Sequence, residues 1–181
     1  MKFLRFIKKI IFVVAFILPL FSFDNKALYI SDASLSELQD RRYSDKNIKF
    51  DAVVTNSPYK KEGTGLKNEN NVKLISRHEI EGNLEDFIKA ASVVLKDKGS
   101  MYMVNRPERL VDIFEYLRKY KLEPKELQIV YSKISSKPNL VLVKATKNAN
   151  KYLKVLEPLY IYKENGEYTD EVLKIYGKRG K

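Results

Sequence analysis

The stretch that most constrains this chain is residues 50–59, which read F-D-A-V-V-T-N-S-P-Y. Residues 50–54 form an apolar run of strand length with β-branched side chains, and the run stops at Thr55 and Asn56. Pro58 has no N–H to donate to a sheet, so it ends the strand in a fixed turn, and Tyr59 follows directly. This pattern is typical of a buried strand that presents a site at the carboxyl edge of an α/β sheet.

The side chains at this strand end suit an amino group attached to a flat ring. The Asn56 side-chain carbonyl and the main-chain carbonyl of Ser57 can each accept a hydrogen bond from an exocyclic amine. Tyr59 offers an aromatic face on which the ring can stack. An ordinary strand exit with a packed tyrosine is the alternative interpretation of the same residues.

Residues 56–59, N-S-P-Y, resemble the N-P-P-Y motif of S-adenosylmethionine-dependent methyltransferases that modify adenine, cytosine or glutamine amines. Ser57 stands where that motif usually has its first proline. Other segments resemble one subgroup, the tRNA (adenine-N6)-methyltransferases that modify valine tRNA beside the anticodon. The resemblance runs in order from about residue 50 to about residue 177, and its further segments are I-S-R-H-E at 75–79, M-V-N-R-P-E-R-L at 103–110, L-E-P-K at 122–125, P-N-L-V-L at 138–142, P-L-Y-I-Y at 158–162 and G-E-Y-T at 166–169.

The resemblance implies a Rossmann-like fold, S-adenosylmethionine as cofactor, tRNA as partner and no metal. The predicted catalytic residues are Asn56, Ser57, Pro58 and Tyr59, and the predicted cofactor-binding residues are Asp32 and Asn56. The predicted RNA-binding residues are Tyr59, Lys60, Lys61, Arg77, Arg106 and Arg109. Two of these assignments have alternatives. Asp32 also fits a solvated loop or helix N-cap, and the two arginines at 106 and 109 also fit ion pairs with Glu108 or Asp112 that orient a helix.

The sequence departs from this family in its first part. Full-length relatives begin with a glycine-rich strand-to-helix turn that lets the backbone approach the cofactor, whereas the first glycine here is Gly63. Relatives also usually have histidine where Asn105 stands. The chain is therefore either a truncated or rearranged copy with a replaced upstream part, or a remnant that no longer binds the cofactor.

Composition indicates which kinds of partner the chain can bind and which kinds of metal and thiol chemistry it cannot perform. The chain has 181 residues, enough for one domain with a real core, and its 34 Lys+Arg against 23 Asp+Glu give a net charge of +11. This charge favours a polyanion, either nucleic acid or an anionic membrane surface, although an AT-rich genome also enriches lysine. With no cysteine and one histidine, disulfides, thiolate chemistry and multi-histidine metal sites are excluded.

Residues 1–25 look like a signal or an anchor. Four basic residues precede an apolar run over residues 10–23, which is shorter than the roughly 20 residues of a membrane span. A cleaved signal, an uncleaved anchor and a core helix are the three interpretations. A tRNA enzyme is expected in the cytoplasm, and weak membrane association through residues 3–23 is the alternative. The expected organisation is a signal-like segment at 1–25, a connector at 26–49, a partial methyltransferase domain at 50–177 and a basic tail at 178–181.

Periodicity predicts the remaining elements of an α/β fold, the C-terminal part of a doubly wound sheet that ends in an antiparallel hairpin. Asn83 is predicted to cap a helix over residues 84–96 with Asp86 as its capping-box acid, and Gly99 to end it. A second helix is predicted to begin at Pro107, with a buried face that includes Val111. The predicted strands are 28–30, 50–54, 100–104, 127–131 and 140–143, followed by a tyrosine-rich C-terminal extension.

Overall fold

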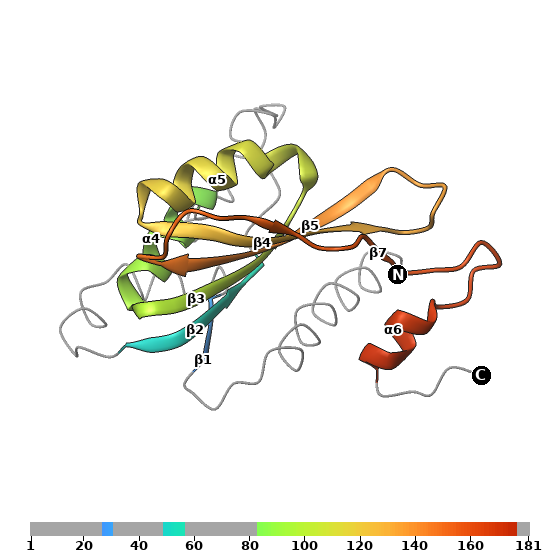
Figure 1. The fold of residues 1–181 in the computed structure, drawn as a ribbon, viewed down its shortest axis with the longest axis horizontal. Coiled ribbons are helices and arrows are strands. Elements are labelled where there is room, and N and C mark those ends of the chain that lie inside the picture. Colours follow the sequence, from blue (N-terminus) through green and yellow to red (C-terminus); the bar gives the residue numbers. More distant parts are fainter. Residues whose placement is uncertain (1–26, 31–48, 57–82, 177–181) are drawn as a thin grey trace, which may run out of the picture.

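The computed structural model describes residues 27–30, 49–56 and 83–176, which form one seven-stranded sheet with helices on both faces (Figure 1). The strand order is β1-β2-β3-β5-β4-β6, and β7 also pairs with β4. In chain order the elements are β1 (Ala27–Ile30), β2 (Phe50–Thr55), α4 (Leu84–Val94), β3 (Leu95–Asn105), the 3-10 helix η2 (Pro107–Arg109), α5 (Leu110–Lys119), β4 (Leu122–Tyr131), β5 (Pro138–Lys147), β6 (Lys154–Val155), β7 (Leu159–Tyr160) and α6 (Asp170–Ile175).

The sheet is parallel on one side and antiparallel in its middle. β1, β2 and β3 run parallel to one another, while β5 lies antiparallel between β3 and β4. This arrangement confirms the predicted hairpin and the predicted back half of a doubly wound sheet. Both hairpin strands are longer than predicted, because polar side chains such as Lys144 and Glu126 pair across the strands, 3.0 Å apart, and extend the ladder beyond the apolar run.

α4 begins as predicted and ends earlier. The Asn83 side chain accepts a hydrogen bond from the Asp86 N–H at 3.0 Å, and the Asp86 carboxylate accepts one from the Asn83 N–H at 3.1 Å. The helix stops at Val94 instead of residue 96, because the chain passes straight into β3 with an extended Leu95. Gly99 therefore lies inside β3. A Cβ there would sit 3.1 Å from the Asp51 carbonyl oxygen, so glycine allows β3 to approach β2 closely.

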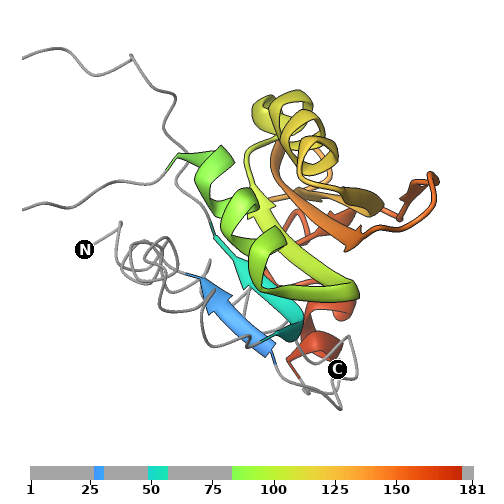
Figure 2. The same cartoon turned by 90° about the vertical axis from the view of Figure 1, so that its left-hand side faces the viewer.

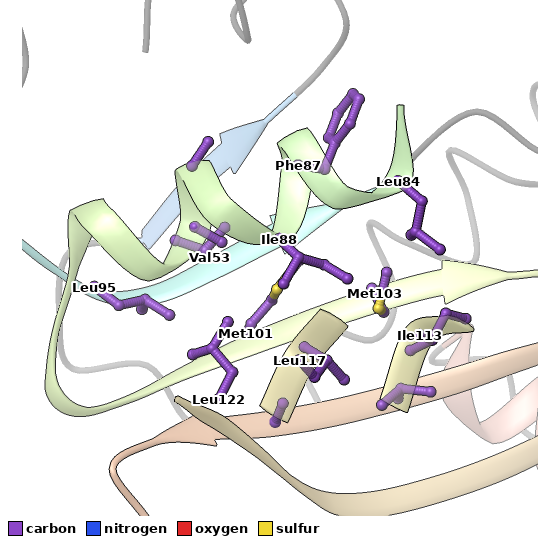
Figure 3. Close-up of a cluster of buried hydrophobic side chains, with 14 of the residues drawn as sticks. Val53, Leu84, Phe87, Ile88, Leu95, Met101, Met103, Ile113, Leu117 and Leu122 are labelled. Atoms are coloured by element: carbon purple, nitrogen blue, oxygen red, sulfur yellow. The ribbon is translucent and has the colours of Figure 1, made fainter. Parts of the chain in front are cut away.

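α4 and α5 cover one face of the sheet and enclose the larger core (Figures 1 and 2). Figure 3 shows Phe87 and Ile88 of α4 and Ile113 and Leu117 of α5 among the buried side chains of this cluster. Val111 was predicted to share the buried face of α5, and that prediction is wrong, since its side chain is 78% exposed. It lies one residue off the stripe of Leu110, Ile113, Phe114 and Leu117 that faces the sheet.

The C-terminal segment, residues 158–176, covers the opposite face of the sheet. Leu159 and Val172 pack there against buried residues of β2 and β3, including Val54 and Val104, and α6 lies on the side away from α4 and α5 (Figure 1). Its tyrosines contact one another, with ring centroids 5.1 Å apart for Tyr162–Tyr168 and 5.6 Å for Tyr168–Tyr176. These rings therefore contribute to packing over the second face.

Residues 1–25, the connector apart from β1 and Lys49, and the basic tail lie outside the described residues. Within the part of the chain that the structure describes, no helix combines the length and the hydropathy needed to cross a bilayer.

Candidate active site

The carboxyl ends of three neighbouring parallel strands meet at one edge of the sheet. Ile30 at the end of β1 is paired with Thr55 at the end of β2, and Thr55 is paired with Met103. β3 continues two residues further, to Asn105. Asn56 comes directly after Thr55, so Asn56 and Asn105 lie at the ends of adjacent strands at the same edge, where α/β proteins bind ligands.

The polar side chains at this edge differ in their access to solvent. Thr55 and Asn105 are 0% exposed, and Asn56 is half-buried. The Asn105 Oδ1 atom accepts a hydrogen bond from the Arg106 N–H at 2.7 Å, which holds the turn out of β3. Of the two asparagines at the ends of β2 and β3, Asn56 is thus the one with solvent-accessible surface.

Arg106 ties the end of β3 to the start of β5. Its Nη1 atom donates to the Asn139 carbonyl oxygen at 3.1 Å and to the Asn139 Oδ1 atom at 2.6 Å. Because β5 runs antiparallel to β3, its amino end lies at the carboxyl edge of the parallel strands. Arg106 therefore links β3 to β5 at the same edge of the sheet that carries Asn56.

Arg109 is held in the turn that begins α5. Its Nε atom lies 2.7 Å from Asp112 Oδ2, and its side chain is 12% exposed. This ion pair is the alternative that the sequence offered for Arg109, in which the arginine orients the helix. The phosphate contacts of Arg106 and Arg109 stay predictions.

The structure brings Asn56 and Arg106 of the predicted set to one edge, with Arg109 at the first turn after it. The other predicted site residues, Asp32, Ser57, Pro58, Tyr59, Lys60, Lys61 and Arg77, lie outside the described residues. Sequence analysis missed Asn139. This residue lies in the P-N-L-V-L segment of the resemblance, but only the antiparallel pairing of β5 with β3 places it beside Arg106.

The described groups at this edge are amides, a hydroxyl and a guanidinium, whose donors and acceptors can bind and orient a ligand. Such a set suits a reaction in which positioning supplies most of the rate. Within residues 27–30, 49–56 and 83–176 there is no cluster of three or more His, Asp or Glu side chains that could hold a metal ion.

The fold matches solved methyltransferase structures. A predicted O-methyltransferase from Agrobacterium tumefaciens superposes with a TM-score of 0.58 at 18% identity, over 78% of this chain and 59% of that one. The M1.HpyAVI–SAM complex has a TM-score of 0.46 at 17% identity, over 76% of this chain and 66% of that one. At 18% identity, the first of these similarities indicates the fold alone.

No family model matches this sequence, and no curated protein does. The chain spans about three fifths of the length of the O-methyltransferase that it resembles. The described residues therefore share the Rossmann-like α/β fold of this O-methyltransferase structure.

Proposed function

We propose that this chain is an S-adenosylmethionine-dependent methyltransferase domain that methylates the exocyclic amine of adenine in tRNA. The observation that carries the proposal is the position of Asn56, which follows the strand between two parallel neighbours in a sheet of the methyltransferase fold. The N-S-P-Y sequence at 56–59 supports an amine as the methyl acceptor, and the net charge of +11 supports a nucleic acid as the substrate.

Two residues at or near the carboxyl edge would hold the cofactor. S-adenosylmethionine, when bound, supplies an electrophilic methyl group. Asn56 would contact the cofactor together with Asp32, which comes two residues after the end of β1 in the sequence. Since Ile30 and Thr55 are paired, the strands that precede Asp32 and Asn56 in the chain are neighbours in the sheet.

The proposed role of Asn56 is to orient the acceptor amine. Its side-chain carbonyl accepts a hydrogen bond from one amine hydrogen, which directs the nitrogen lone pair toward the methyl group. The Ser57 carbonyl accepts a hydrogen bond from the second amine hydrogen, and Tyr59 stacks on the adenine ring. The surplus proton leaves the nitrogen for water, so no side chain has to act as a general base.

A second candidate is an RNA-binding remnant without catalysis, tethered to a membrane if residues 3–23 act as an anchor. The first glycine of the chain is Gly63. This observation favours the second candidate, because a glycine-rich turn is what lets a backbone approach such a cofactor.

The test uses the full-length chain. Calorimetric titration with S-adenosylmethionine is followed by incubation with unmodified tRNA transcripts and quantification of N6-methyladenosine by mass spectrometry. We expect cofactor binding and adenine methylation by the wild type. Asn56→Ala should lower kcat by on the order of 100-fold, the usual cost of removing one preorganised hydrogen-bonding group, with unchanged circular dichroism.

The matched control is Asn150→Ala, which removes the same side chain from an exposed position after the end of β5, away from the carboxyl edge. Its activity should equal that of the wild type. Full activity in Asn56→Ala would refute the proposed role. A folded chain that binds tRNA but not the cofactor would establish the remnant instead.

A further inference from the structure

We propose that the chain holds a single-stranded segment of its RNA on a second surface, the β6 strip. The strip consists of Lys125 on β4 and of Lys151, Tyr152, Lys154 and Val155 on or before β6. The inference rests on the proposed function in taking RNA as the ligand, but it does not need the cofactor or the residues of the carboxyl edge.

The strip presents apolar side chains to solvent. Tyr152 is 70% exposed and Val155 is 62% exposed, while every other tyrosine from residue 83 to residue 176 is at least partly buried. Lys125 Nζ lies 5.5 Å from the centroid of the Tyr152 ring, so the ring packs against this cation and its remaining surface is open. An exposed aromatic face beside lysines is what single-stranded nucleic acids use for stacking.

The backbone that carries Tyr152 is anchored on both sides. The Asn150 carbonyl accepts a hydrogen bond from Lys125 Nζ at 3.0 Å, and the Leu156 N–H donates to the Leu127 carbonyl at 2.8 Å. Between them, Leu153 packs against the larger core. Tyr152 is therefore presented on a fixed backbone, so little conformational entropy is lost when a base stacks on it.

The charge of the strip is positive. Lys151 and Lys154 are exposed, and no carboxylate among the described residues lies within ion-pair distance of either. Glu126, opposite Lys154 in the ladder, pairs with Lys144 at 3.0 Å. The exposed lysines are thus available to phosphates, while the Tyr152 ring, which lies between them in the sequence, is available to a base.

The position of the strip indicates a polynucleotide and not a free nucleotide. β6 is four strand spacings from β2 in the sheet, about 19 Å at the usual strand separation. One nucleotide cannot contact both Asn56 and Tyr152 across this distance. An RNA with an unpaired segment can place one base at the carboxyl edge and another on the strip.

The experiment measures binding of the full-length chain to a fluorescent oligouridylate of about 12 nucleotides by anisotropy, without cofactor. Tyr152→Ala should weaken binding by about 5- to 100-fold, the usual effect of losing one stacked base, and Tyr152→Phe should preserve it. The double variant Lys151→Gln/Lys154→Gln should reduce the slope of log affinity against log salt by about 1.4, at about 0.7 per phosphate contact.

The controls make the same kinds of change elsewhere. Val111→Ala removes exposed apolar surface on α5, and Lys89→Gln/Lys174→Gln removes two exposed charges on α4 and α6. Both variants should bind the oligouridylate with the affinity of the wild type. The slope of log affinity against log salt should fall less in Lys89→Gln/Lys174→Gln than in Lys151→Gln/Lys154→Gln. Thermal melts of each variant confirm that it is folded.

Unchanged RNA affinity in folded Tyr152→Ala would overturn the inference. A Tyr152→Ala variant that binds RNA like the wild type but binds phosphatidylcholine–phosphatidylserine vesicles more weakly would also overturn it, and would assign the strip to a membrane. The two proposals fail separately. If Asn56→Ala loses methylation while Tyr152→Ala keeps full RNA affinity, only the proposal for the strip is refuted. If Tyr152→Ala loses RNA affinity but the wild-type chain binds no cofactor, only the proposed methyltransferase activity is refuted.

Discussion

Lys147→Met is expected to destabilise the fold at the C-terminal end of α4. The helix passes straight into β3 without a capping turn, so its last carbonyls need donors from elsewhere. Lys147 Nζ donates to the Ser92 carbonyl at 2.6 Å and to the Leu95 carbonyl at 2.9 Å. A second lysine, Lys49, donates to the Val93 carbonyl at 2.8 Å.

The size of the effect follows from these contacts. Each hydrogen bond from a charged donor contributes about 1.5–3 kcal/mol in mutational series. Burial lowers the pKa of Lys147, and the charge of Lys49 lowers it further, so the desolvation of the ammonium offsets part of that gain. We therefore expect a net loss of about 2 kcal/mol, which corresponds to a fall in Tm of about 4–8 °C for a chain of this length.

The assay is thermal unfolding followed by circular dichroism, supported by urea titration. Methionine keeps most of the length and apolar stem of lysine, so the comparison isolates the ammonium group. Lys89→Met, on the exposed surface of α4, serves as control and should change Tm by about 1–2 °C at most. A change in Tm for Lys147→Met within that same range would refute the assignment of Lys147 as the cap of α4.

Two further predictions concern the two faces of the sheet. Leu117→Ala, at a fully buried position, should cost about 3 kcal/mol in urea unfolding, whereas the exposed Val111→Ala should cost less than about 0.5 kcal/mol; similar values for both would contradict the assigned face of α5. Burial, reinforced by Tyr168 and then Tyr162, raises the pKa of Tyr176 to about 12. The folded state therefore keeps a proton that the unfolded state loses above about pH 10, and stability should fall as pH rises through that window. Tyr176→Phe should show a smaller fall in the urea midpoint between about pH 9 and about pH 11.5, and an equal fall in both proteins would show that Tyr176 is not packed as described.

Local sequence rules predicted the parts of the fold that depend on neighbouring residues. The apolar run that ends at Asn56, the capping box of Asn83 and Asp86 and the hairpin all follow from short-range patterns, and the structure confirms each. The exposure of Val111 was missed because it depends on which side of α5 meets the sheet. The family resemblance added the chemistry expected at Asn56, which no periodicity contains.

The sequence by itself therefore determined most of the elements and the fold class, because propensity, capping and turn formation act over a few residues. Tertiary structure decided which distant residues meet. The pairing of β3 with β5 places Asn139 against Arg106, 33 positions apart in the chain, and the return of residues 158–176 covers the second face. The anchoring of Leu153 leaves Tyr152 exposed beside Lys125. Such contacts depend on sheet order and burial, which only the folded chain establishes.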